Sequence, residues 1–121
     1  MNDLTVVEIK AFVPARDFEL SKRFYVDLGF ALAWSEDNLA YLRHGEASFL
    51  LLNFYEPAHA GNFMMHILVK DVGAWWRHVQ AQDLVGKYDV MAQPPEDRPW
   101  GLRDFVLTDP TSVLWRIGQT M

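Results

Sequence analysis

The stretch RDFELSKRFYVDLGF (residues 16–30) encodes a helix whose two ends are both marked. Asp17 is a residue type that caps helix N-termini, and Gly29 has the backbone freedom that a helix C-terminal cap requires. Apolar residues recur between them at every fourth position and so share one face: Leu20, Phe24 and Leu28. The stretch therefore predicts an amphipathic helix over residues 18–28.

A second stretch, LVKDVGAWW (residues 68–76), repeats this plan further along the chain. Asp71 is its capping residue and lies 54 residues after Asp17. Each helix follows a β-rich run, residues 4–13 in the first half and residues 63–70 in the second. We therefore expect the same order of elements twice. The alternative is an ordinary α+β domain whose halves look alike by chance.

Short β-rich runs separated by turn residues follow each helix. They cover residues 30–34, 39–45, 47–55, 103–109 and 113–118. Proline and glycine interrupt the pattern twice, which predicts a linker over residues 56–62 and a loop over residues 93–101. One sheet with one helix cannot cover both of its faces, so pairing two halves is the economical solution. We predict an α+β fold in which residues 1–121 form a single domain of two βαβββ modules, about 1–56 and 62–121, with a cupped, mixed sheet.

The composition of this chain is that of a globular protein, with 50% hydrophobic and 22% charged residues among 121. A net charge of −5 argues against binding to a nucleic-acid backbone and favours a cationic small molecule. No apolar run approaches the roughly 20 residues of a membrane-spanning helix, and the polar opening Met1-Asn2-Asp3 does not resemble a signal peptide. The chain has no cysteine, which suits a reducing compartment. We expect a cytoplasmic protein.

Few residues in this chain form a local catalytic motif. The four histidines, at positions 44, 59, 66 and 78, lack the close helical spacing of a zinc-hydrolase site. His66 alternates with Met64 and Leu68 along a strand, so it is either a hydrogen-bonded core histidine or a ligand contact. The chain has no Gly-x-Ser-x-Gly elbow, phosphate loop or dinucleotide fingerprint.

Aromatic residues are abundant, with five Trp, eight Phe and four Tyr. Trp75 and Trp76 lie on the second helix, where core packing or a dimer contact accounts for them. Trp100 lies between Pro99 and Gly101 in a predicted loop. Two roles remain open for Trp100, which are stacking on a ligand and plugging a subunit interface.

Together with RPWGLRDFVLTDPTSVLWRIG (residues 98–118), the two helix-bearing stretches make the chain resemble the vicinal oxygen chelate superfamily. This superfamily includes glyoxalases, extradiol dioxygenases and antibiotic-resistance proteins. The loop around Trp100 and the ending from Asp109-Pro110 to Arg116 are most similar to bleomycin-binding resistance proteins. There, a tryptophan in this loop stacks on the flat rings of the drug. Ser112 departs from the family, in which glycine is usual after the Asp-Pro pair.

The resemblance also implies where metal ligands would lie, because the enzymes of this superfamily place them on the first and late strands of each module. Those positions fall here on Lys10, Leu51, Met64 and Arg116. None of the four is a normal metal ligand, and two of them are cations that repel a divalent ion. We therefore expect neither a metal nor another cofactor. A two-residue slip in register would instead offer Glu8, Asn53 and His66.

The resemblance implies a metal-free homodimer that sequesters a planar ligand, such as a bleomycin-like drug or another metabolite, in a cleft shared between subunits. Trp100 would be the main stacking platform. The expected wall of the cleft consists of Trp34, Phe49, Asn53, His66, Lys10 and Arg116. The last two favour an anionic or carbonyl group on the ligand, whereas the net charge favours a cation. The alternatives are a glyoxalase-like or dioxygenase-like enzyme, which needs the slipped ligand set, and a dimerising accessory subunit without a ligand.

Overall fold

The computed structural model describes residues 2–121, so Met1 of the polar opening lies outside the described residues. The first half contains β1 (Phe12–Pro14), α1 (Phe18–Leu28), β2 (Ala31–Ser35), β3 (Leu39–His44) and β4 (Ala47–Leu52). A short helix, α2 (Pro57–Asn62), occupies the predicted linker. The second half contains β5 (Met64–Leu68), α3 (Val72–Ala81), α4 (Leu84–Tyr88), β6 (Ala92–Asp97), β7 (Leu102–Thr108) and β8 (Leu114–Thr120).

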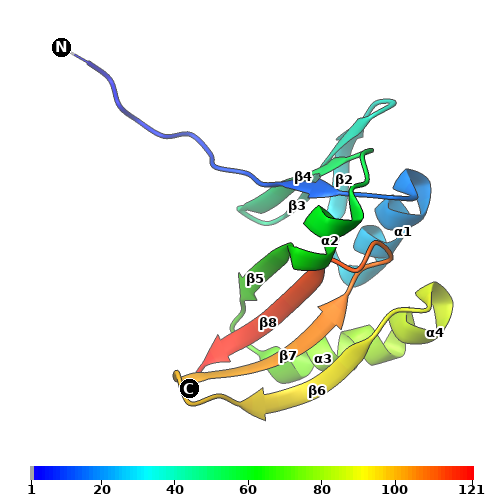
Figure 1. The fold of residues 1–121 in the computed structure, drawn as a ribbon. Helices are drawn as coiled ribbons and strands as arrows, with labels where there is room; N and C mark the ends of the chain where they lie inside the picture. Colours follow the sequence, from blue (N-terminus) through cyan, green and yellow to red (C-terminus); the bar gives the residue numbers. More distant parts are fainter. Residues whose placement is uncertain (1) are drawn as a thin grey trace.

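These strands form two four-stranded sheets with the same topology (Figure 1). The first sheet has the order β1-β4-β3-β2 and the second sheet the order β5-β8-β7-β6. In both sheets the first strand of the half pairs in parallel with the last strand, and the other pairs are antiparallel. The α+β class and the repeated order of elements are confirmed. The division of a single domain into modules at about 1–56 and 62–121 stays a prediction.

The two predicted helix caps are formed as their residue types indicate. The carboxylate of Asp17 accepts a hydrogen bond from the Leu20 amide at 3.1 Å, and that of Asp71 accepts one from the Ala74 amide at 3.0 Å. Gly29 ends α1 with a φ of 129°, a value that side chains disfavour, and its amide donates to the Tyr25 carbonyl. The caps therefore set the start of both helices and the end of the first.

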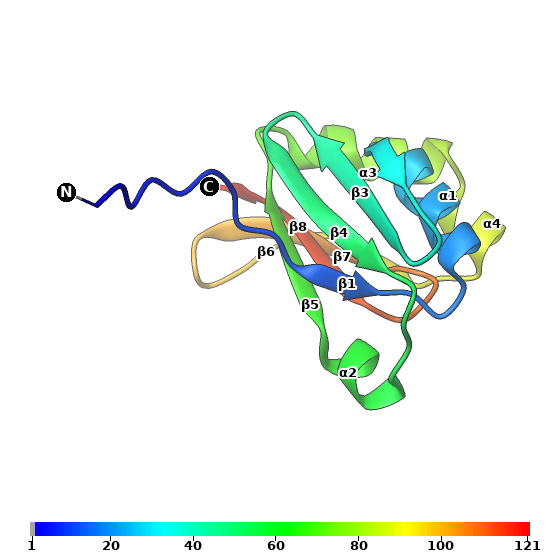
Figure 2. The ribbon, with the colours of Figure 1, turned by 90° about the horizontal axis from the view of Figure 1, so that it is seen from above.

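The β-rich run of residues 4–13 forms a strand only near its end, so this prediction was wrong for most of its length. Phe12 pairs with Leu50 of β4, and the parallel register would place Ile9 beside Ala47, where β4 begins. Residues 2–8 therefore extend beyond the start of β4 and project from the body of the chain as an arm (Figures 1 and 2). The strand pattern is present in the arm, but no neighbouring strand of the described chain reaches it.

The loop predicted over residues 93–101 was also wrong in part, because β6 occupies its first half. Gln93 pairs with Val106 of β7, and Glu96 pairs with Asp104, but the register shifts between them. Pro94 and Pro95 fill the interruption, since proline has no amide hydrogen to give to a neighbouring strand. β6 lies at the edge of its sheet, where such a strand is tolerated.

Each sheet has one face covered by helices and one face free of them, which we call the helix-free face (Figure 2). Helix α1 contacts β2 and β4, and α3 contacts β6, β7 and β8. The fully buried side chains that form the core lie on the covered side, among them Phe24, Tyr25, Phe49, Phe105 and Trp115. Residues that alternate with core residues along the strands therefore lie on the helix-free faces.

A buried polar chain joins the two halves at the centre of the core. The indole Nε1 of Trp115 donates to the Tyr25 hydroxyl at 2.9 Å, and this hydroxyl donates to Asp109 at 2.5 Å. Asp109 also accepts hydrogen bonds from the amides of Thr111 and Val113, which hold the turn before β8. Burial raises the pKa of Asp109, while these donors oppose the shift by stabilising the carboxylate.

A second contact between the halves lies near the surface. Asp27, at the end of α1, accepts hydrogen bonds from the Tyr88 hydroxyl at 2.6 Å and from Lys87 Nζ at 2.9 Å. Its backbone carbonyl is 2.9 Å from His78 Nε2 of α3. The hydrogen bond from Tyr88 is the main reason that the pKa of Asp27 lies below its ordinary value. This contact is half exposed, so its contribution to stability can be compared with that of the buried contact between Tyr25 and Asp109.

We predict that Tyr25→Phe lowers the free energy of unfolding by about 1.5–3 kcal/mol, the range for a hydrogen bond to a buried charged group. The substitution leaves the Asp109 carboxylate short of a donor and Trp115 without its acceptor. Urea denaturation measures the change, with Tyr88→Phe as the control that removes a less buried hydroxyl. Equal losses in the two variants would contradict a central role for Tyr25.

Ser112 gives a second prediction, because it has a φ of +74° in the turn between β7 and β8. This left-handed conformation costs energy for any residue with a side chain, and the Ser112 side chain is exposed. We expect Ser112→Gly to raise the free energy of unfolding by roughly 0.5–1 kcal/mol, since relief of strain exceeds the entropy cost of glycine. A fall in the thermal midpoint would contradict this account.

Candidate functional site

The helix-free face of the second sheet brings together apolar and charged side chains. Met64, His66 and Leu68 alternate along β5 with the packed residues Met65 and Ile67. His66 lies directly beside Arg116 of β8 in the parallel register. Met64 and Leu68 expose 57% and 59% of their surface, which is unusual for apolar residues on a sheet.

One buried carboxylate and two guanidinium groups form an ionic cluster on the same face. Asp104 of β7 is 1% exposed and accepts a hydrogen bond from Arg98 Nε at 2.7 Å. Its other oxygen is 3.2 Å from Nη1 of Arg116. Arg98 also contacts the exposed Glu96 at 3.1 Å. A buried carboxylate needs such partners, because leaving it unpaired costs several kcal/mol.

A pocket of about 190 Å³ adjoins His66, between the start of β4 and strand β5. It is lined by Phe30, Ala47, Ser48, Phe49, Met65, His66, Ile67, Leu68 and Trp115. Gly118 lets Asp104 and His66 pack closely, because a Cβ atom there would lie 3.1 Å from the Asp104 Cβ and 3.7 Å from His66 Nε2. Glycine in a strand interior marks places of close approach.

A second group of side chains surrounds Tyr41 on the helix-free face of the first sheet. The Tyr41 hydroxyl donates to Glu8 at 2.9 Å, and Glu8 also contacts Lys10. The Lys10 ammonium lies 5.2 Å from the centre of the Tyr41 ring, and the Trp34 ring meets the same ring edge-on at 6.1 Å. Trp34 remains 44% exposed.

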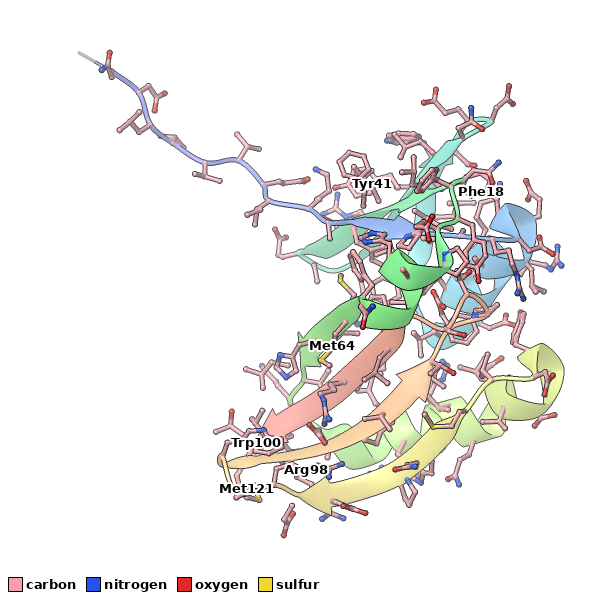
Figure 3. All side chains as sticks on the ribbon, in the orientation of Figure 1. Phe18, Tyr41, Met64, Arg98, Trp100 and Met121 are labelled. Carbon is pink, nitrogen blue, oxygen red and sulfur yellow. The ribbon has the colours of Figure 1, made fainter. Side chains whose placement is uncertain are left out.

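Trp100 lies in the loop between β6 and β7 and is 59% exposed. The loop turns at Gly101, whose φ of 88° suits glycine. Figure 3 shows Trp100 at the end of the second sheet, next to Arg98 and Met121, with Tyr41 on the other half of the molecule. Within residues 2–121 the Trp100 ring has no aromatic or cationic stacking partner.

The predicted site residues therefore divide into separate groups. His66 and Arg116 are neighbours on the second sheet, whereas Lys10 and Trp34 meet at Tyr41 on the first. The structure joins these two groups by no hydrogen bond or ring contact within residues 2–121. Asn53 follows β4 and lies 3.4 Å from Asn38, away from both.

Phe49 was expected on the wall of the cleft and Leu51 at a metal-ligand position of the superfamily. Both side chains belong to the core, although Phe49 also lines the pocket beside His66. Phe49 is 1% exposed and packs against Tyr25 and Trp115, and Leu51 is fully buried. The parallel register shows the reason: Leu51 is the partner of the core residue Val13, so Leu50 lies on the helix-free face instead. A prediction one residue out of register moves a side chain to the opposite face of a strand.

Sequence reasoning missed Tyr41, Arg98 and Asp104, although a signal for Asp104 was present. Asp104 is a charged residue inside the β-rich run of residues 103–109, and such a residue requires a cationic partner if the run is a strand. Arg98 was hidden in a segment interpreted as a loop. Tyr41 had no distinguishing pattern.

The metal centre of the superfamily does not fit the residues present here. Lys10, Met64 and Arg116 lie on the helix-free side, where they supply two cations and one thioether. In the slipped set, Glu8 is engaged by Tyr41 and Lys10 on the first sheet, whereas His66 lies on the second. Between residues 2 and 121 no three metal-binding side chains of His, Cys, Asp or Glu are grouped. No helix in this range is long and apolar enough to cross a membrane.

The chain belongs to the Glyoxalase/Bleomycin resistance protein/Dioxygenase superfamily, whose model matches residues 6–117. Its fold is similar to that of a bleomycin-binding protein complexed with bleomycin, with 22% identity over 96% of this chain and 100% of that one and a TM-score of 0.80. It is also similar to TnmS3, an antibiotic-binding protein from Streptomyces sp. CB03234, with 22% identity over 98% and 100% of the two chains and a TM-score of 0.77.

Enzymes share the fold as well. Lactoylglutathione lyase from Agrobacterium tumefaciens is 14% identical over 97% of this chain and 96% of that chain, with a TM-score of 0.70. A search of curated proteins found no match. Likeness of fold therefore does not separate binding proteins from enzymes, and the function has to be argued from the site.

Proposed function

We propose that the protein binds and sequesters a planar small molecule without a metal, in a cleft that forms when the helix-free faces of two chains come together. The observation that carries this proposal is the large exposed apolar and aromatic surface of those faces and of the loop beside them. It comprises Phe12, Trp34, Met64, Leu68 and Trp100, which are 44–59% exposed. Aromatic and apolar side chains that converge with a few polar groups are typical of small-molecule sites.

The proteins with similar folds support a binding role. The bleomycin-binding protein holds bleomycin, and TnmS3 is an antibiotic-binding protein. The side chains at the metal-binding positions of the superfamily also support a binding role, since Arg116 occupies a position where an enzyme of this superfamily needs a residue that coordinates the metal. We also propose a cytoplasmic location, which suits a chain without cysteine.

The arm supports a homodimer. Three of its side chains, Leu4, Val6 and Val7, are 76–90% exposed, so their apolar surface gains nothing from burial within residues 2–121. The arm also has the β-branched composition of a strand without a partner in its own chain. A second copy supplies that partner and would bring one chain's first sheet toward the other's second sheet.

For the dimer, we predict that the wild type sediments at twice the mass of its 14.0 kDa chain at micromolar concentration. The double variant Val6→Asp/Val7→Asp sediments as a monomer, because charges on the arm oppose its burial. Val26→Asp is the matched control, since Val26 is 46% exposed on α1, away from the arm. A monomeric wild type would overturn the dimer.

For the ligand, we predict that the neutral planar probe anthraquinone-2-carboxamide binds saturably and quenches tryptophan fluorescence. Trp100→Ala weakens this binding by about 1–3 kcal/mol, the range of aromatic stacking contributions. Phe54→Ala is the control, because Phe54 is similarly exposed at 55% but lies outside both sheets. If Trp100→Ala binds the probe as tightly as the wild type does, Trp100 does not stack on the ligand.

Metal analysis of the protein purified without chelator tests the metal-free part of the proposal. We expect less than about one tenth of a divalent ion per chain, because the faces offer cations where ligands are needed. About one divalent ion per chain would instead support the enzyme alternative.

A further inference from the structure

We propose that the planar ligand carries an anionic group, a carboxylate or an ionised phenol or enol, which pairs with Arg116. This inference rests on the proposed function and names the ligand class of the same site. It departs from the expectation drawn from net charge, because the charge that a bound ligand meets is local and the helix-free faces are richer in cations than the whole chain.

Several N–H donors of Arg116 have no acceptor among residues 2–121. Its side chain is 29% exposed, and only its Nη1 atom has an acceptor among residues 2–121, the carboxylate of Asp104. A guanidinium group carries five N–H donors in a planar fork that matches two carboxylate oxygens. Its Nε and Nη2 atoms are therefore left for water or for a ligand.

The two carboxylates of the ionic cluster lie closer to Arg98 than to Arg116. Asp104 is shared by two arginines, and its shorter contact is to Arg98, at 2.7 Å against 3.2 Å for Arg116. Glu96 also lies on Arg98, and with 63% of its side chain exposed it is largely screened by water. The guanidinium of Arg116 is thus the less neutralised of the two.

The surroundings of Arg116 strengthen the attraction for an anion. The exposed apolar residues Met64 and Leu68 lie on the same face, so a ligand covering them excludes water from the guanidinium group. An ionic hydrogen bond is stronger in such a setting than in bulk water. The ring of His66, beside Arg116, offers a face for the flat part of the molecule.

The group around Tyr41 on the first sheet also has a net positive charge, because it holds two cations and one carboxylate, Glu8, which contacts Lys10. Lys10 and Arg43 both lie near the Tyr41 ring, with the Arg43 guanidinium carbon 6.0 Å from its centre. Two chains that join these faces would surround the ligand with cations from both sheets. An anionic ligand fits such a cleft, and a polycation does not.

The test compares two probes that differ by one charge, anthraquinone-2-carboxylate and anthraquinone-2-carboxamide, by titration into the full-length protein. We expect the carboxylate to bind about tenfold to hundredfold more tightly, as a charge-assisted hydrogen bond does. Arg116→Gln abolishes this preference. Arg103→Gln preserves it, because Arg103 lies on the opposite face of β7 and pairs with Asp97.

Asp104→Asn is expected to change the carboxylate affinity in the opposite direction from Arg116→Gln. A variant that merely disturbed the structure would not increase this affinity. Asp104→Asn removes the anion that competes for Arg116 while keeping an oxygen to accept from Arg98, so carboxylate affinity rises several-fold. Circular dichroism measures whether each variant folds. If Arg116→Gln does not fold, the carboxylate affinity of Asp104→Asn tests the inference by itself. A lower carboxylate affinity in folded Asp104→Asn would overturn the inference.

The outcomes separate the inference from the proposed function. Equal affinities of the two probes for the wild type overturn the anionic ligand and leave the binding of planar molecules intact. Tighter binding of metal-free bleomycin, a cationic probe, than of the carboxylate overturns it too. If none of the three probes binds, the proposed function is overturned together with the inference.

Discussion

The hydrogen bond from Tyr25 to Asp109 is the constraint on which the rest of the structure depends. It ties the first helix of one half to the turn that begins the last strand of the other, with both groups buried. The same carboxylate holds the turn through two backbone amides, and that turn sets where β8 begins. Arg116 lies on β8, so a contact in the core determines where a charge appears on the helix-free face. A buried polar group of this kind contributes less to net stability than to the choice of one arrangement.

The helices and the order of strands could be predicted because their signals are local. Asp17 and Asp71 are capping residues at matching places, and a cap needs no information from distant residues. The wrong predictions concern two segments whose structure depends on the strand beside them. The run of residues 4–13 has the composition of a strand, but β4 is too short to pair with all of it. The run around Pro94 has the composition of a loop, but β7 lies close enough to pair with its ends.

The candidate site was harder to predict than the fold, because a site depends on the register between strands. Arg116 and His66 were chosen separately, and only the parallel pairing of β5 with β8 shows that they are neighbours. Leu51 shows the opposite case. The metal-ligand position inferred on this strand fell on a fully buried core residue, one residue away from Leu50 on the helix-free face. The pairing of Arg98 with Asp104 depends on the irregular register of β6, which no pattern in the residues indicates.

The two prolines of β6 have a consequence for how concentrated this protein can be. A protein that acts by holding its ligand, without turning it over, is useful only when it is as abundant as the ligand. Abundance endangers a protein with open sheets, because an exposed edge can recruit further strands into aggregates. Pro94 and Pro95 have no amide hydrogens and interrupt the register of β6, the outer strand of the second sheet, so that edge offers a poor template. The dimer proposed above would use the arm of the first half instead, and association through the arm would end at two chains.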